Sequence, residues 1–310
     1  MSEPPPSVKP TAEALTPSLQ PPVNQNPGAY EELHRKCRDV FPMCFEGAKL
    51  MVQKGLSSQF QITHTLSIST ANTGYRFGAT YIGTQDYPGG ETFPVLLADT
   101  DGSGNTSATI LHQFAEKYRV KLQGQVQQGK LAAAQGTFER RGRLSTYGIM
   151  LGNTDLINQS GIVVGHLLRR ITERLDLGAE LVYQYDKRSG QHSALSYAAR
   201  YTAPNWTLSS TLGTAGVQVL YHHKQHDGLQ FGIEFDANLR QAECVTTFAY
   251  QAELPESAVT VRASCDTNWT VGAVFEKRLS PTLPFTLAIS GLLNHLKGQG
   301  KFGVGLIIGA

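Results

Sequence analysis

The sequence predicts an all-β protein that crosses a membrane as a closed barrel. From Leu175 to Asp186 and from Leu229 to Arg240, apolar residues alternate with polar ones, and Val182 is the one apolar residue on the polar side of the first run. Neighbouring side chains of a strand point to opposite faces, so each run has one apolar and one polar face. Each run is close to the roughly 9–11 residues that a tilted strand needs to cross a bilayer. Strands of soluble sandwiches are usually nearer five or six residues.

The composition agrees with a barrel. Charged residues make up 17% of the 310 residues, below the roughly 25% that is usual in soluble domains, yet the mean hydropathy is only −0.23. A barrel accounts for both values, because only every second strand residue faces lipid. No run approaches the roughly 18 consecutive apolar residues of a membrane-spanning helix, since His166 interrupts the best candidate. The net charge of +2 gives no reason to expect a nucleic-acid partner.

The amino terminus and the cysteines indicate a compartment. The sequence begins Met-Ser-Glu-Pro-Pro-Pro, without the basic and apolar regions of a secretory signal peptide, so export to a bacterial outer membrane is disfavoured. Four cysteines form no CxxC pair and are expected to be free thiols in a reducing compartment: Cys37, Cys44, Cys244 and Cys265. A barrel inserted from the cytosol belongs in a mitochondrial or plastid outer membrane.

Three regions are expected along the chain. Residues 1–26 hold most of eight prolines that lie at or before Pro27, and they are expected to form a disordered tail. Residues 27–42 are expected to contain one amphipathic helix over Tyr30–Phe41, which Pro42 ends. Its apolar residues recur at helical spacing: Tyr30, Leu33, Cys37, Val40 and Phe41. So short a helix needs a surface on which to dock.

The sequence pattern predicts strands only for residues 46–309. Turn signals rich in Gly, Pro, Asn and Asp arrive every ten to fourteen residues or so. Their spacing predicts about nineteen strands, with the boundaries least certain between residues 93 and 152, where the alternation is weaker.

The helix and the first strands carry a family resemblance. The sequences NPGAYEELHRK at 26–36, RDVFP at 38–42, EGAKL at 46–50 and KGLS at 54–57 resemble the pore-forming subunit of the translocase of the outer mitochondrial membrane (TOM). Further likeness lies in GATYIGT at 78–84, GAELVY at 178–183 and DTNW at 266–269, so the resemblance covers about residues 26–309. It implies an odd-stranded barrel of the mitochondrial porin superfamily, with a parallel pair of first and last strands and the helix in the lumen.

The same resemblance implies a function and its partners. It implies a channel for unfolded preproteins with basic presequences, located in the mitochondrial outer membrane. TOM receptors, small helical TOM subunits and lipid would surround the barrel. It implies no enzyme activity and no cofactor, since the driving force would come from partners. The alternative is a metabolite and ion channel of the voltage-dependent anion channel type, which would favour anions where the translocase favours cations.

The carboxyl end matches a second motif. Four residues fit the pattern of the mitochondrial β-signal (polar, any, glycine, any, any, hydrophobic, any, hydrophobic): Lys301, Gly303, Leu306 and Ile308. The sorting and assembly machinery is expected to bind such a final strand by strand addition. The simpler interpretation is a last strand with one apolar face.

Three other patterns are interpreted as turns or solvated residues. The GxGxxG at 298–303 has too few residues after it for a dinucleotide fold. The acidic loop at 99–104 has Ile110 where a calcium loop needs its twelfth ligand. His222 and His226 would lie roughly 13 Å apart on a strand, so they and the adjacent His223 are not expected to bind a metal.

If the apolar side chains face lipid, the polar ones line the lumen. Six carboxylates are then expected on the substrate pathway: Asp176, Glu180, Glu234, Asp236, Asp266 and Glu276. A low-dielectric wall that carries carboxylates attracts basic presequences, and weak, scattered sites let the chain leave again. Arg240, Arg262 and Arg278 also face inward, and the alternative is that the charges only pair and solvate the wall. Glu180 and Glu234 have no cation within two residues on their own strand face, and Asp176 has none within the run that starts at Leu175.

Overall fold

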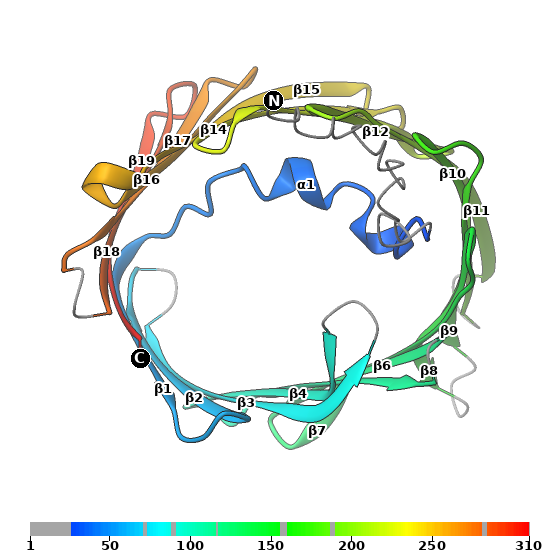
Figure 1. The fold of residues 1–310 in the computed structure, drawn as a ribbon, viewed down its shortest axis with the longest axis horizontal. Helices are drawn as coiled ribbons and strands as arrows, with labels where there is room; N and C mark the ends of the chain where they lie inside the picture. Colours follow the sequence, from blue (N-terminus) through cyan, green and yellow to red (C-terminus); the bar gives the residue numbers. More distant parts are fainter. Residues whose placement is uncertain are drawn as a thin grey trace, which may run out of the picture.

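The computed structural model describes residues 26–70, 73–87, 91–115, 117–155, 160–186, 190–280 and 284–309. Nineteen strands form one closed sheet around a wide lumen (Figure 1). They are β1 (Gly47–Gly55), β2 (Phe60–Ile68), β3 (Gly74–Tyr87), β4 (Glu91–Asp101), β5 (Thr106–Phe114), β6 (Tyr118–Gln127), β7 (Lys130–Arg141), β8 (Ser145–Asp155), β9 (Ser160–Arg170), β10 (Leu175–Asp186), β11 (Gly190–Thr202), β12 (Trp206–Gly213), β13 (Gly216–His226), β14 (Leu229–Asn238), β15 (Glu243–Leu254), β16 (Val259–Asp266), β17 (Thr270–Arg278), β18 (Phe285–Asn294) and β19 (Gln299–Gly309).

Every strand pairs antiparallel with the next one in the chain, and the barrel closes through one parallel pair. In that pair β1 lies beside β19, with the register running from Gly47 opposite Gly303 to Gln53 opposite Gly309. Closure leaves every strand with two neighbours, so the backbone groups of the sheet are paired between strands. The nineteen strands and the parallel closing pair confirm the predicted fold class.

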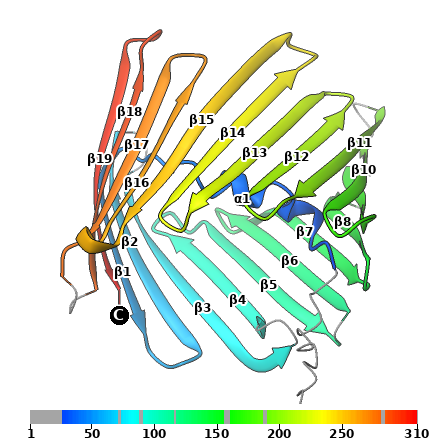
Figure 2. The ribbon, with the colours of Figure 1, turned by 45° about the horizontal axis from the view of Figure 1, so that its top comes forward.

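The strands lie tilted around the lumen (Figure 2), and the alternation of side chains persists across them. Large apolar side chains point outward and remain exposed, as Leu181 at 50% and Phe235 at 36% illustrate. On the outer face, the ring of Trp206 lies 5.2 Å from that of Tyr201 and 6.0 Å from that of Tyr221. Rows of aromatic residues are typical of the interface between lipid and water around membrane barrels.

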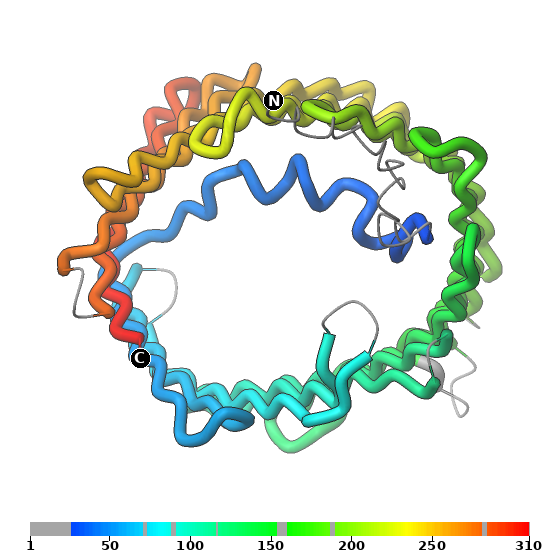
Figure 3. Tube along the Cα trace, in the orientation of Figure 1, coloured from blue at the N-terminus to red at the C-terminus, as the bar shows by residue number. Residues whose placement is uncertain are grey.

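Residues 26–46, here called the lumenal segment, lie inside the barrel along one part of its wall (Figure 3). Asn26 contacts the β7–β8 turn at Gly142. Because consecutive strands are antiparallel, the turns after odd-numbered strands share one rim, and β1 starts at the opposite rim. The lumenal segment therefore runs from one rim to the other before it enters β1 at Gly47.

Two short helical pieces replace the single helix expected over Tyr30–Phe41. A 3-10 turn (η1) spans Tyr30–Glu32, and one α-helical turn (α1) spans Arg35–Arg38. Between them His34 adopts φ −99° and ψ 0°, which departs from the ideal α-helical values of about −63° and −42°. An isolated helix of this length is marginal in water, so contacts with the wall decide its conformation. Of the proline-rich tail expected over residues 1–26, residues 1–25 lie outside the described residues, whereas Asn26 is bound to the wall rather than part of a disordered tail.

Within the described residues, no helix is both long enough and apolar enough to cross a membrane.

Candidate functional site

Glycines on the inner face of the wall show which side chains point into the lumen. A Cβ atom placed on Gly178 of β10 would lie 3.2 Å from the Tyr30 ring. One on Gly232 of β14 would lie 3.2 Å from the Cys37 sulfur. Since Tyr30 and Cys37 belong to the lumenal segment, the even-numbered residues of β10 and β14 face inward.

The same argument applies to the strands before the seam. A Cβ atom on Gly272 of β17 would lie 3.0 Å from the sulfur of Cys44 and 3.3 Å from the hydroxyl of Ser264 on β16. The even-numbered residues of β16 and β17 therefore face inward as well. All six expected carboxylates lie on lumenal positions: Asp176, Glu180, Glu234, Asp236, Asp266 and Glu276.

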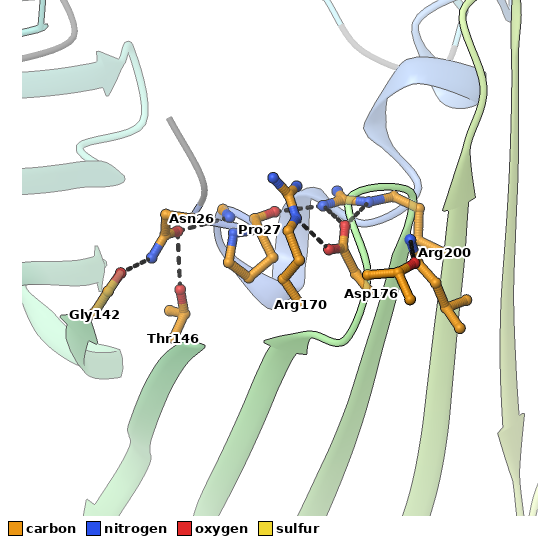
Figure 4. A network of polar contacts seen from close by, with 10 residues as sticks. Asn26, Pro27, Gly142, Thr146, Arg170, Asp176 and Arg200 are labelled. Atoms are coloured by element: carbon orange, nitrogen blue, oxygen red, sulfur yellow. Dashed lines mark hydrogen bonds and ion pairs between the residues drawn. The ribbon is translucent and has the colours of Figure 1, made fainter. Parts of the chain in front are cut away.

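Asp176 forms ion pairs with two arginines and is only 1% exposed (Figure 4). One carboxylate oxygen lies 2.8 Å from Nε of Arg170, and the other lies 2.7 Å from a terminal nitrogen of Arg200. Arg200 also donates a hydrogen bond to the carbonyl oxygen of Pro27. This network anchors the first residues of the lumenal segment. The sequence showed no cation near Asp176 on its own strand, because the two arginines come from β9 and β11.

Beside this network, Asn26 holds the start of the lumenal segment against the β7–β8 hairpin (Figure 4). Its amide nitrogen donates to the carbonyl oxygen of Gly142, and its amide oxygen accepts a hydrogen bond of 3.2 Å from Thr146. The amide oxygen also accepts from the backbone N–H of Gly28 at 2.8 Å. Asn26 therefore joins the lumenal segment to two residues that are more than one hundred positions away in the chain.

Glu180 and Glu234 also lie against the lumenal segment. Glu180 stands opposite His166 of β9, whose ring stacks on that of Tyr30 at 5.7 Å. Glu234 accepts a hydrogen bond of 2.7 Å from Gln218, and Gln218 in turn accepts one from Arg38 of α1 at 3.5 Å. The docked segment therefore restricts access to both carboxylates.

The other three carboxylates lie away from these contacts. Asp236 is exposed on β14. Asp266 accepts a hydrogen bond of 2.7 Å from the backbone N–H of Thr270 in the β16–β17 turn. Glu276 lines a cavity of about 640 Å³ near one rim, together with Glu253 and Arg278.

The apolar side of the lumenal segment packs into the wall. Leu33 is buried with Leu168 of β9 and Ala198 of β11, and Tyr30 packs against this cluster. Cys37 and Val40 are buried too, whereas Phe41 is half-buried against Gly232. The expected apolar residues thus contact the wall although the continuous helix does not form.

His34 supplies a polar anchor that the sequence analysis missed. Its ring nitrogens lie 2.8 Å from the hydroxyl of Ser209 and 2.8 Å from that of Thr211, both on β12. Burial, and then the charges of Arg38 and Arg200, lower the pKa of His34 to about 4. The ring is therefore neutral at neutral pH. Nothing in the local sequence marks His34, because its two partners lie more than 170 residues further along the chain.

The thiol of Cys37 is a second internal contact of the lumenal segment. It donates to the backbone carbonyl oxygens of Tyr221 and Ile233, at 3.4 Å and 3.7 Å. Burial, followed by the charge of Glu234, raises the pKa of Cys37 to about 11. A thiol with so high a pKa is a poor nucleophile. All four cysteines are free, and among the described residues no three His, Cys, Asp or Glu side chains gather as metal ligands.

The four residues of the predicted β-signal divide between the two faces of β19. Gly303 faces inward, where a Cβ atom would lie 2.8 Å from the Phe45 ring. Lys301, on the same face, pairs with Glu46 at 3.3 Å. Leu306 and Ile308 occupy the opposite, outward face.

A closed β-barrel with an apolar outer face and a charged inner face is a membrane pore. The sequence profile of the eukaryotic porin family matches residues 26–305. The chain is 66% identical over 286 residues to the mitochondrial import receptor subunit TOM40 homolog of Caenorhabditis briggsae, covering 92% of this chain and 95% of that relative. It is 45% identical over 316 residues to the homolog of Xenopus tropicalis, covering 100% of this chain and 93% of that relative. The chain therefore belongs to the eukaryotic porin family, among the TOM40 homologues.

A solved structure of a mutant Rh. blastica porin has a TM-score of 0.47 to this chain, at 15% identity. The alignment covers 74% of this chain and 97% of that porin.

Proposed function

We propose that this barrel is the protein-conducting channel that imports unfolded preproteins across the mitochondrial outer membrane. The observation that carries the proposal is a closed barrel with a charged inner face, in a chain that is 66% identical to a mitochondrial import receptor subunit. The channel performs no covalent chemistry, so the driving force for transport comes from its partners. The identity to import receptor subunits favours this function over that of a metabolite channel of the anion-channel type. A reversal potential in a salt gradient tests the choice by the sign of the ion selectivity.

The substrate pathway starts at the lumenal carboxylates that lie away from the segment. Asp236, Asp266 and Glu276 are away from the segment contacts and are the first sites for a basic presequence. Glu180 and Glu234 become accessible to a preprotein when the lumenal segment moves away from the wall. Asp176 anchors that segment. Scattered weak sites suit a chain that must leave as readily as it enters.

The partners follow from the same proposal. TOM receptors and small helical TOM subunits contact the lipid-facing wall, and preproteins pass through the lumen. During biogenesis the sorting and assembly machinery recognises the last strand through four residues: Lys301, Gly303, Leu306 and Ile308. The outward apolar positions of that strand suit lipid, and its inward positions contact the chain itself.

The test neutralises together the three carboxylates that lie away from the lumenal segment, as Asp236→Asn, Asp266→Asn and Glu276→Gln. Each change keeps the size of the side chain, and Asn still accepts the hydrogen bond from Thr270. Import of a basic presequence substrate should slow more than import of a substrate without a presequence. The difference should shrink at high salt, because mobile ions screen exposed charges over about 8–10 Å.

A matched control removes charge from turns of one rim, as Glu173→Gln and Glu256→Gln, and is compared with the lumenal pair Asp236→Asn and Asp266→Asn. Glu173 and Glu256 are exposed. The control should leave both substrates near the wild-type rate. If the lumenal variant slows both substrates equally, or neither, the carboxylates do not guide presequences.

A further inference from the structure

The residues that immediately precede β1 form a compact contact across the inside of the barrel seam. The backbone N–H of Phe45 donates a hydrogen bond of 2.9 Å to the hydroxyl of Ser290 on β18. Its ring lies over two glycines of β19, so that a Cβ atom on Gly303 would be 2.8 Å from Cδ2 and one on Gly305 would be 3.0 Å from Cζ. The thiol of Cys44 donates to the carbonyl oxygen of Gly291 at 3.6 Å.

Glu46 extends this contact to both sides of the seam. Its carboxylate lies 3.3 Å from the ammonium group of Lys301 on β19 and accepts a hydrogen bond from Thr70, beyond the end of β2. The hydrogen bond from Thr70, and then the one from Lys301, lower the pKa of Glu46, so the group is charged at neutral pH. We call Cys44–Glu46 the seam clasp, because it joins β17, β18 and β19 to the chain that enters β1.

The seam clasp contacts the same residues of β19 that carry the inward half of the β-signal. Lys301 pairs with Glu46, and Gly303 lies under Phe45. The outward half, Leu306 and Ile308, does not face the clasp. The lumenal face of the β-signal therefore has an intramolecular partner in the finished barrel.

Strand addition by an assembly machine uses the free edge of β19, which is the edge that pairs with β1 in the closed barrel. β19 makes similar backbone hydrogen bonds with a strand of the machinery and with β1. These bonds therefore favour the closed barrel over the machinery-bound state only a little. The contacts of Phe45 and Glu46 are different, because they form only when the start of β1 reaches β19. They stabilise the closed barrel relative to the machine-bound strand.

We propose that Phe45 and Glu46 are release determinants, which shift the last strand from the assembly machinery to β1. The proposal rests on the β-signal assigned under the proposed function, and it adds a later step to recognition. Recognition brings β19 to the machinery, and the seam clasp completes the exchange. The glycines at 303 and 305 leave room for the Phe45 ring on the lumenal face.

The first experiment compares Phe45→Ala with Phe41→Ala. Both residues belong to the lumenal segment and lie against a glycine, but Phe41 faces Gly232 of β14, far from the seam. Radiolabelled variants are imported into mitochondria, and native gels follow the machinery-bound intermediate and the mature complex. Phe45→Ala should bind the machinery like the wild type and leave it about tenfold more slowly, the ratio that a loss of about 1.4 kcal/mol produces. Phe41→Ala should be released at the wild-type rate.

The second experiment is a double-mutant cycle at the clasp. Gly305→Ala should slow release while Phe45 is present, since the added Cβ meets its ring, and should add nothing in the Phe45→Ala background. Gly291→Ala is the control, because a Cβ atom there has nothing within 4 Å. Equal release of the two phenylalanine variants, or an equal effect of Gly305→Ala in both backgrounds, would overturn the proposal.

Failure at recognition gives a different result. A chain with Leu306→Asp and Ile308→Asp should not reach the machinery at all. If it binds and is released normally, the β-signal assignment under the proposed function is wrong, and the recognition step on which the clasp proposal rests is removed with it.

Discussion

The inner wall of the barrel has two parts, one that the lumenal segment covers and one that it leaves mostly uncovered. Where the lumenal segment docks, the inward positions of β10–β19 include many small residues: Gly178, Ala198, Ser209, Gly232, Gly272, Ser290, Gly303 and Gly305. On β2–β7, several inward positions carry long polar residues: Gln61, Arg76, Gln123, Gln125 and Gln135. Figure 1 shows α1 beside the first part and distant from β3 and β4. We call these the docking wall and the open wall.

At the contacts with the lumenal segment, small residues position the segment beside the ion-pair network that anchors its start. A backbone segment packs closely only where the wall offers short side chains, since atoms in contact lie about 3.5–4.0 Å apart. The long side chains of Arg76 and Gln125 on the open wall are exposed, so this wall leaves room for water and for a passing chain. The segment does reach toward the open wall at one edge, where Glu31 pairs with Lys121 of β6 at 3.3 Å.

The largest expected effect separates a structural carboxylate from an accessible one. Asp176→Asn leaves Arg170 and Arg200 without their counter-charge in a buried site. Breaking such a pair costs about 3–5 kcal/mol, so thermal unfolding of the purified barrel in detergent should begin at a clearly lower temperature. Asp236→Asn, at an exposed lumenal position, is the control and should leave the unfolding temperature nearly unchanged. Equal shifts for the two variants would remove the anchoring role of Asp176.

A second prediction breaks the contrast between the two walls directly. Gly232→Leu on the docking wall places a side chain where Cys37 and Phe41 lie, 3.2 Å and 3.3 Å from the first added carbon. Overpacking of this kind costs about 1–3 kcal/mol, which should displace the lumenal segment and raise single-channel conductance. Gln123→Leu on the open wall should leave the conductance near the wild-type value. An unchanged conductance for Gly232→Leu would show that the segment does not need the small residues.

The smallest expected effect concerns pH and His34. The pKa of about 4 in the docked state lies below the ordinary value of 6.5, so docking is favoured above pH 6.5 and weakens as pH falls toward 4. Ser209 and Thr211 accept or donate to the neutral ring, while Arg38 and Arg200 disfavour its charged form. Channel conductance should therefore rise on acidification through this range. His34→Asn should flatten the rise, and a rise of the same size in this variant would assign the effect to other groups.

Much of the fold follows from the sequence, because alternation is a local property. The runs at 175–186 and 229–240 predict strands, their outward faces and the membrane environment without knowledge of any partner strand. Turn residues between the runs then predict about nineteen strands. The inward positions of Glu180 and Glu234 follow from the same alternation, since a strand has only two faces.

The tertiary structure alone decided what those positions contact. Asp176 meets Arg170 and Arg200 because the register of three strands brings them together, and register depends on every turn between them. His34, Ser209 and Thr211 meet across more than 170 residues, and these contacts help replace the expected helix with two short pieces. The contact of Phe45 with Gly303 exists only once the barrel closes, because closure brings the two ends of the chain side by side. Strand faces are thus a local consequence of the chain, whereas contacts across the lumen depend on the whole circumference.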